Sequence, residues 1–401
     1  MTSRSTRSVP TATRIYGRLN VDTLRRSLDE VVRRHEALRT RIVMIDGSPV
    51  QEIDEEWGFE LGIIDLTAAE PEIKEAEAKR LVEELVNENI DVAVGPLFAA
   101  RLLELSDQTH VLVVAMEHTI SDGFSLEILS RDIWTLYWQS LRGLPLSLPT
   151  VAIQLGDYAV WQQKTSRWWT DKHGTYWKER LADATRVRFP SDRDVEGVSR
   201  FRSKNTPIQF GMALTSKLRE LARRRHTLLA MTVLTAYVAV ILRWQEKWDL
   251  LLNFLVNGRH RPELGNTVGF IASSLFLRVQ LTQNDTFFTL LECVTKEYYT
   301  AYEHCDFGRL SIPFPGPDFK RCTSFNWQTA LPDNSHVTVG RCAGSDGSAD
   351  VVEFKPFPFR NAASDTDIEW DGDPEVLNGD PGIGLWDTAD GVVGNVWYRA
   401  D

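Results

Sequence analysis

The stretch from Val111 to Met116 constrains this chain most, because it is a run of six apolar residues. Such a run predicts a strand that is buried on both faces of a sheet. The polar segment Glu117–Gly123 follows at once, and Phe124 then opens a segment whose apolar residues recur at helical spacing. His118 therefore lies where a buried strand leads into a helix, a place where α/β proteins tend to keep their functional groups.

Neighbouring residues give this strand a setting. Residues 97–105 form a second apolar stretch, and Ser106–Thr109 has the composition of a turn, so the sequence predicts a hairpin that delivers His118. The helix after Gly123 is expected to end near Gly143, before an exposed, proline-containing connection.

A length of 401 residues predicts two lobes rather than one small domain. We place them at residues 1–182 and 183–401, with a hydrophilic boundary over 183–199. A charged helix over 72–89 is expected to turn Ile73, Leu81, Leu85 and Val86 inward. The other predicted strands are 12–20, 50–53, 206–210, 250–256 and 396–401, and the other predicted helices are one capped by Asn20 or Asp22, 214–225 and 228–242.

Charge and composition exclude several classes of function. The net charge is −11, and the region from Ser345 to Asp401 has 13 acidic residues against 3 basic ones, which predicts a solvated, loop-rich surface. No basic face is available for nucleic acid. No run of 18 apolar residues and no signal peptide occur, so we expect no membrane partner. The four widely spaced cysteines predict reduced thiols in a cytoplasmic protein, and no spacing suggests a metal site.

The pattern His118-x-x-x-Asp122-Gly123 resembles the core motif of the condensation domains of non-ribosomal peptide synthetases, and more loosely that of the chloramphenicol-acetyltransferase-like acyltransferases. Further segments resemble elements of the same domains in the same order: 34–40, 157–161, 176–181, 268–278, 302–306 and 325–328. The likeness covers about residues 12–330. It implies an α/β fold of two chloramphenicol-acetyltransferase-like lobes, each a mixed sheet flanked by helices, arranged as a V with the site between them.

The chemistry that this resemblance implies is amide formation, or ester formation, between an acyl or aminoacyl thioester donor and an acceptor. Both substrates are held by phosphopantetheine arms of carrier proteins, so no covalently bound cofactor is expected. The chain contains no adenylation-type or carrier-type motif. Donor and acceptor peptidyl or aryl carrier proteins are therefore the expected partners, together with adenylation domains or other synthetase modules.

His118 is the expected catalytic residue, because a mostly neutral imidazole can accept a proton from an amine or aim it. The N–H of Gly123, near a helix start, is a candidate oxyanion donor. By resemblance Asp122 forms an internal ion pair that fixes the loop, with Arg278 or Arg41 as its partner, so replacing Asp122 is expected to damage folding as well as chemistry.

Glu117 stands where the family usually has a first histidine, a residue regarded as more structural than catalytic. A carboxylate beside His118 would raise the pKa of the imidazole and weaken it as a base. Adjacent residues leaving a strand point in opposite directions, however, which favours Glu117 facing into the fold. The residues expected along a substrate tunnel are Glu117, Ser125, Ser273, Asn326 and Gln328.

Two alternatives differ in kind from amide formation. The first is a catalytically impaired module on the same fold that docks or recruits a partner, and Glu117 motivates it. The second is a relative that epimerises a carrier-bound residue or uses acyl-CoA as donor. The segments at 157–161 and 268–270 resemble the condensing type more than the epimerising type. Cyclising relatives have paired aspartates in the motif, so His118 argues against them.

Overall fold

The computed structural model describes residues 4–5, 8–55, 58–88, 90–184, 200–305, 323–329, 339–343, 349–356, 367–369, 382–388 and 391–400. The chain forms two compact units. The first unit comprises Met1–Trp161, Arg259–Ile271 and Asp333–Ala363, and the second comprises Gln162–Gly258, Ala272–Pro332 and Ser364–Asp401. The opening segment of the first unit thus ends at Trp161, before the predicted boundary at residue 182, and two later segments also belong to that unit.

A six-stranded mixed sheet forms the centre of the first unit. Its strands are, in order, β13 (Val339–Ala343), β14 (Ala349–Pro356), β2 (Ser8–Tyr16), β8 (Thr109–Glu117), β7 (Phe98–Ser106) and β5 (Gly62–Asp65). β7 and β8 form the predicted hairpin, and β5 joins β7 in parallel. Outside this sheet are two ribbons and a short 3₁₀ turn: β1 (Arg4–Ser5) with β6 (Ile90–Asp91), β3 (Thr40–Ile45) with β4 (Ser48–Ile53), and η1 (Glu36–Arg39).

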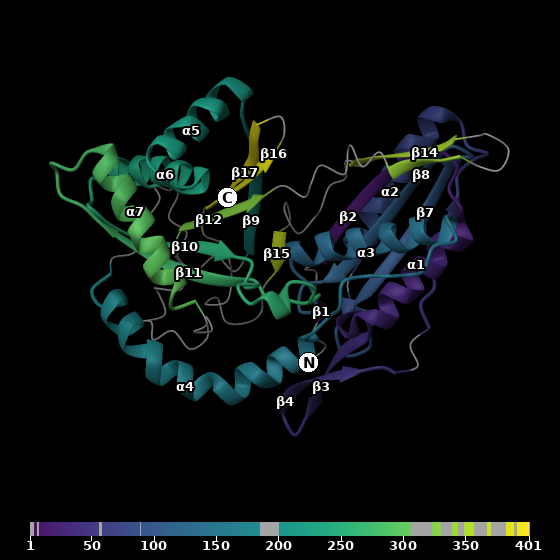
Figure 1. Cartoon of the computed structure of the whole chain (residues 1–401), viewed down its shortest axis with the longest axis horizontal. Helices are drawn as coiled ribbons and strands as arrows, with labels where there is room; N and C mark the ends of the chain where they lie inside the picture. Colours follow the sequence, from purple (N-terminus) through teal and green to yellow (C-terminus); the bar gives the residue numbers. More distant parts are fainter. Residues whose placement is uncertain are drawn as a thin grey trace. The chain divides into compact units, whose positions relative to one another are not determined.

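Helices cover both faces of β8, which confirms that this strand is buried on two sides (Figure 1). On one face Leu112, Val114 and Met116 pack in a core with α1 (Val21–Arg34) and α3 (Gly123–Leu141). On the other face the intervening residues Val111, Val113 and Ala115 pack against α2 (Pro71–Val86). The alternation follows from the period of two in a strand, and it fixes which way the residues beyond Met116 point.

The inward face predicted for α2 is wrong at Ile73, which is 61% exposed. Leu85 and Val86 are buried as predicted, together with Ala78 and Val82, and Leu81 packs against them partly buried. At 3.6 residues per turn, Ile73 lies about 140° around the helix axis from Ala78, so it cannot share that stripe.

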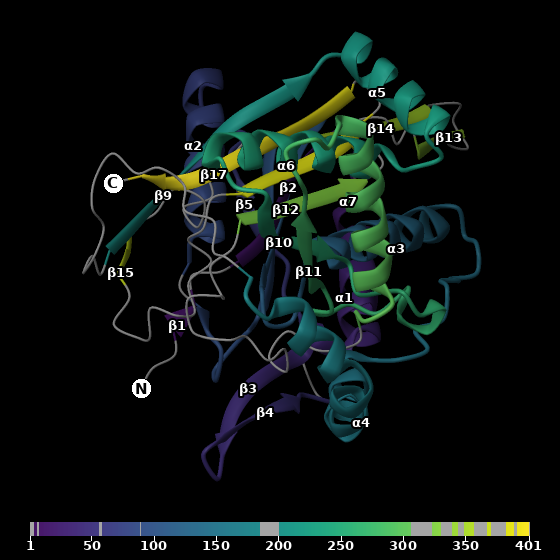
Figure 2. The ribbon, with the colours of Figure 1, turned by 90° about the vertical axis from the view of Figure 1, so that its left-hand side faces the viewer.

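The second unit contains a seven-stranded mixed sheet. Its strands are, in order, β11 (Ser273–Gln280), β10 (Asp249–Val256), β12 (Thr323–Thr329), β16 (Gly382–Thr388), β17 (Gly391–Ala400), β9 (Arg200–Phe210) and β15 (Asp367–Glu369). Its helices are α5 (Met212–Arg224), α6 (Leu229–Gln245) and α7 (Phe287–Tyr302), and Figure 2 shows α6 and α7 over β10, β11 and β12. The long helix α4 (Leu155–Leu181) begins in the first unit and continues in the second.

In the acidic region after Ser345, the residues that the structure describes form strands, and the remainder of the predicted loop-rich surface lies outside the described residues. β14 extends the first sheet by pairing with β2, and β16 and β17 lie inside the second sheet. The strand predicted at 396–401 is confirmed as the end of β17. The boundary segment predicted over 183–199 lies largely outside the described residues.

Among the helices that the structure describes, none combines on its own the length and the apolar character needed to cross a bilayer. The pair α5 and α6 meets the criteria only when taken together, across a bend of 104°.

Among the described residues of the first unit, His35 and His110 are buried, and they predict how its stability depends on pH. Burial lowers the pKa of His35 and of His110, against the raising effects of Asp132 and Asp107. The unfolded chain therefore binds more protons than the folded one below pH about 6.5. The contribution of these two histidines to the free energy of unfolding is complete above that pH. It is lost as the pH falls toward their lowered pKa values. We expect the melting temperature to fall between pH 7.5 and 5.5, and the fall to be smaller in His35→Gln.

Melting curves across that pH range test this prediction. His226→Asn is the matched control, because His226 is exposed and its replacement alters no buried imidazole. A slope against pH that is the same in His35→Gln as in the parent would contradict the role of His35.

Candidate active site

The turn after β8 is held in shape by its own hydrogen bonds. The hydroxyl of Ser121 donates to the carbonyl oxygen of Glu117 at 2.8 Å, and the amide of Ile120 donates to the same oxygen at 3.2 Å. The side chain of Ile120 is buried in the core between the sheet and α3. This turn therefore presents His118 in one orientation instead of as part of a free loop.

His118 has a defined tautomer. Its Nδ1 lies 2.7 Å from the carbonyl oxygen of Ser121. Because a carbonyl oxygen can only accept, Nδ1 carries the hydrogen, and the lone pair of the neutral ring is on Nε2. The side chain is partly exposed. The imidazole thus offers an acceptor nitrogen to whatever approaches from solvent.

Phe270 packs against the ring of His118, with the two centroids 4.8 Å apart and the planes inclined by 54°. Phe270 is 52% exposed, so it forms a wall of the site and not part of the core. It comes from Arg259–Ile271, one of the two segments that return to the first unit. This stretch, which we name the return segment, includes the short turn η2 (Pro262–Leu264).

Glu117 faces into the fold, as the alternation along the strand favours. Its carboxylate accepts hydrogen bonds from the amide and the hydroxyl of Thr119, and the residue is 2% exposed. These contacts occupy the carboxylate within the turn, and the expected place of Glu117 along a substrate tunnel stays a prediction. Its carboxylate ties the turn to the end of β8, which is a structural role.

Asp122 forms a buried ion pair with Arg259, whose side chain is 1% exposed against 3% for the aspartate. Nη1 of Arg259 donates to Oδ2 at 2.8 Å and Nη2 to Oδ1 at 3.1 Å. The amide of Ile271 donates to Oδ2 at 3.1 Å. Nε and Nη2 of Arg259 also donate to the carbonyl oxygen of Thr267, and Nη2 donates to that of Gly269. This arrangement satisfies both charges and fastens the return segment to the start of α3.

Asp122 is also the N-cap of α3. The amide of Ser125 donates to Oδ1 of Asp122 at 2.9 Å, and the amide of Asp122 donates to the hydroxyl oxygen of Ser125 at 3.2 Å. These two hydrogen bonds form a capping box. That hydroxyl also accepts from the amide of Gly269 at 3.1 Å. Ser125 is fully buried in these contacts, and its expected place along a substrate tunnel stays a prediction.

Gly269 permits the close approach of the return segment. A Cβ built there would lie 2.5 Å from Cδ1 of Leu155, at the start of α4. Leu155 belongs to the core of the first unit, so it has little freedom to move aside. Any larger residue at 269 would thus push apart the contacts that position Phe270.

The two arginines predicted as partners of Asp122 bind other carboxylates, which corrects that expectation. Arg278 donates from Nε and Nη2 to Asp249 at 3.0 and 2.6 Å, within the second unit. Arg41 pairs with Glu52 across the β3–β4 ribbon at 2.8 Å. Arg278 lies in a segment that resembles the family, and Arg41 follows one, but the order of motifs along the chain does not show which carboxylate each arginine reaches.

The remaining predicted site residues are divided between the units. Gly123 is the first residue of α3, where the amides of a helix start have no partners within the helix. Ser273 begins β11, and Asn326 and Gln328 lie on β12, all in the second unit. Their roles toward substrate stay predictions. Among the described residues, no group of three or more histidine, cysteine, aspartate or glutamate side chains is arranged to hold a metal ion.

Sequence reasoning missed Arg259 and the role of Phe270. A signal for Arg259 was present, because three basic residues, 259–261, come shortly after the buried strand β10. That pattern mirrors the position of His118 after β8. It does not single out Arg259 among the three, since only the fold shows which side chain turns inward.

Burial also raises the pKa of nearby Glu127, against the lowering effect of Arg259.

Known proteins resemble this chain over most of its length. The family model of the condensation domain matches residues 1–312. A protein of the linear gramicidin synthase of Brevibacillus parabrevis is 33% identical over 310 residues, which are 77% of this chain but 6% of that protein. The chondramide synthase of Chondromyces crocatus is 31% identical over 300 residues, 75% of this chain and 8% of that protein. This chain therefore spans a small part of the length of such relatives.

Solved structures share the fold at lower identity. The X-domain from teicoplanin biosynthesis, in its complex with OxyB, is 20% identical with a TM-score of 0.74 over 98% of this chain and 84% of that one. At such an identity the likeness shows the fold alone.

Proposed function

This chain belongs to the condensation-domain family of non-ribosomal peptide synthetases, and on that premise we propose that it is an active acyltransferase. It joins a carrier-bound acyl or aminoacyl thioester to a carrier-bound acceptor, forming an amide or an ester. Donor and acceptor carrier proteins are its partners, and their phosphopantetheine arms bring the substrates. The observation that carries the proposal is the fixed tautomer of His118, with its Nε2 available at a partly exposed site.

His118 acts on the attacking amine in this proposal. Nε2 accepts a hydrogen bond from the neutral amine and aims its lone pair at the thioester carbonyl carbon. Because the Nδ1–H stays bound to the carbonyl of Ser121, the ring cannot rotate away as charge develops. The same bond stabilises the imidazolium that forms when Nε2 takes the proton. Phe270 shields one side of the ring from water.

The reaction balances without a further reactant. The C–N bond forms as the amine attacks, and the C–S bond breaks as the tetrahedral intermediate collapses. The proton taken by Nε2 of His118 passes to the departing thiolate, which leaves as the thiol of the donor arm. The amide of Gly123, at the positive end of α3, is the candidate donor to the oxyanion.

A reconstituted assay tests the proposal. A panel of aminoacyl-carrier donors is mixed with aminoacyl-carrier acceptors and this chain, and products are identified by mass spectrometry after release from the carriers. We expect the acceptor carrier to gain the mass of the donor acyl group. The absence of that product for every pair, from folded protein, would count against the proposal.

The second candidate is a module that recruits a partner without catalysis. It is supported by the likeness to the X-domain, which forms a complex with OxyB, and by the replacement of the first motif histidine by Glu117. The burial of Glu117 weakens this support, because its carboxylate is held by Thr119. Capture of a protein partner without turnover would favour recruitment.

Exchange of deuterium at the donor α-carbon without condensation would favour the epimerising reaction.

A further inference from the structure

The return segment is fastened to the first unit at two places. The first is the cluster around Asp122, which binds Arg259 and the amide of Ile271. The second has two parts: Asn266 accepts a hydrogen bond from Arg131, further along α3, and the hydroxyl of Thr267 donates to the carbonyl of Ile153 in the connection before α4. Phe270 lies between Thr267 and Ile271 in the sequence, so its position against His118 depends on both attachments.

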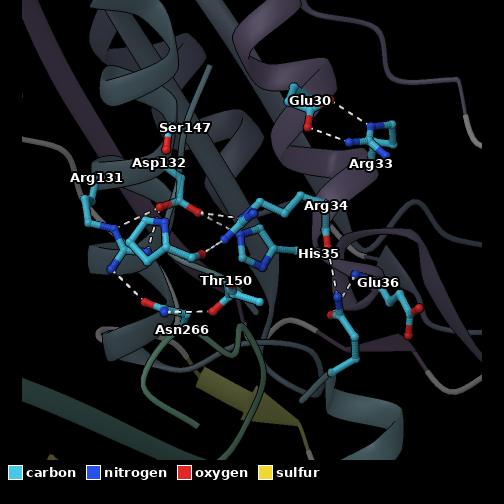
Figure 3. Close-up of polar contacts among 12 residues, drawn as sticks. Glu30, Arg33, Arg34, His35, Glu36, Arg131, Asp132, Ser147, Thr150 and Asn266 are labelled. Atoms are coloured by element: carbon cyan, nitrogen blue, oxygen red, sulfur yellow. Dashed lines mark hydrogen bonds and ion pairs between the residues drawn. The ribbon is translucent and has the colours of Figure 1, made fainter. Parts of the chain in front are cut away.

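The second attachment is a chain of polar contacts (Figure 3). Nε and Nη2 of Arg131 donate to Oδ1 of Asp132 at 2.8 and 2.7 Å, and Nη1 of Arg131 donates to Oδ1 of Asn266 at 2.9 Å. Nδ2 of Asn266 donates to the carbonyl of Thr150 at 3.0 Å. The contacts thus run from α3 to the return segment and on to the connection before α4.

A buried carboxylate fixes the start of this chain of contacts. Asp132 is 0% exposed, and its Oδ2 lies 3.0 Å from Nε2 of His35, which is also 0% exposed. Because a carboxylate only accepts, the ring donates from Nε2. Nε of Arg34 lies 3.3 Å from the same oxygen. With Asp132 held by Arg34 and His35 at the C-terminal end of α1, Arg131 keeps the orientation in which Nη1 reaches Asn266.

The electrostatics of the cluster support an ionised Asp132 beside a neutral His35. Burial raises the pKa of Asp132, but hydrogen bonds from His35 and Arg131 outweigh it, and the net shift is downward. Burial lowers the pKa of His35. The negative charge that orients Arg131 is therefore present at neutral pH.

We propose that Asp132, Arg131 and Asn266 are positioning residues for the reaction at His118. They hold the return segment so that Phe270 packs on the imidazole ring. None of the three contacts the reacting atoms, so their effect on rate passes through Phe270. The expected effect of these residues on rate rests on the proposed function. Their expected effect on the order of the return segment does not.

Hydrogen–deuterium exchange tests the positioning step on the full chain, without substrate. Asn266→Ala removes the link to the return segment and leaves the Arg131–Asp132 pair in place. We expect the amides of residues 259–271 to exchange roughly fivefold faster or more. Arg131→Ala is expected to act in the same way. Arg33→Ala is the matched control, because Arg33 binds the carboxylate of Glu30 with two donors and contacts no residue of the return segment in the described structure.

A double-mutant cycle then tests the effect on rate. We expect Asn266→Ala to lower kcat roughly threefold to tenfold, with little change in KM for the carrier substrates. In a Phe270→Ala background the same substitution should change kcat no further, because the two act through one contact. A structural loss unrelated to Phe270 would instead lower kcat by the same factor in both backgrounds.

The outcomes separate this inference from the proposed function. No product from the parent protein would refute the proposed function, and the exchange data would still decide whether these residues hold the return segment. Exchange of 259–271 that is equal in Asn266→Ala, Arg131→Ala and Arg33→Ala overturns the inference. Faster exchange together with equal kcat losses in both backgrounds also overturns it.

Discussion

Replacing His118 by alanine is expected to lower the rate of amide formation by about 10²–10⁴-fold, the usual contribution of a positioned acid–base group. The reason is the fixed tautomer, since Nδ1 is bound to the carbonyl of Ser121 and Nε2 is the nitrogen available to the amine. The loss should appear in kcat under saturating donor and acceptor, because the imidazole acts on the reacting nitrogen and not on the carrier surfaces. Single-turnover product formation, read by mass spectrometry, measures it.

Two further variants show what kind of loss this is. His118→Gln retains a hydrogen-bond acceptor but cannot take up a proton. Activity that is partly restored in His118→Gln relative to His118→Ala would show that aiming the amine contributes to the rate. Thr119 lies beside His118 in the same turn and is exposed, so Thr119→Ser is a matched control for disturbing the turn. Product formation by His118→Ala at the parental rate would refute the catalytic role.

The parts of the site that were predicted from the sequence depend on local patterns. The strand β8, its hairpin with β7 and the start of α3 follow from a run of apolar residues and a polar turn. These signals lie within a few residues of His118. The inward orientation of Glu117 also followed from strand alternation alone.

The parts that were missed depend on contacts between distant residues. The Asp122–Arg259 pair joins residues 137 positions apart, and nothing in either segment names the other. β14 pairs with β2 at the other end of the chain, a pairing that the acidic, glycine-rich composition around β14 does not indicate. A strand edge supplies hydrogen bonds to a neighbour almost regardless of that neighbour's composition, which a single-sequence pattern does not reveal.

Arg259→Ala is expected to destabilise the first unit by about 3–5 kcal/mol, because it leaves the charge of Asp122 buried without its partner. The side chains of both residues are almost fully buried, so water cannot replace the guanidinium without opening the start of α3. Asp122 also caps α3, and the return segment is held through Arg259. The loss should appear as a lower midpoint in urea denaturation and as faster amide exchange over residues 259–271.

Arg41, one of the two arginines expected to pair with Asp122, provides the control for this prediction. Arg41→Ala removes an exposed ion pair with Glu52, which contributes about 0–1 kcal/mol. If Arg259 stabilises by neutralising Asp122, the double variant Asp122→Asn with Arg259→Ala should recover part of the loss, because no buried charge remains unpaired. If the double variant is as unstable as the sum of the two single variants, the guanidinium acts by packing and by its bonds to Thr267 and Gly269. Equal stability of Arg259→Ala and Arg41→Ala would show that the buried pair does not hold the site together.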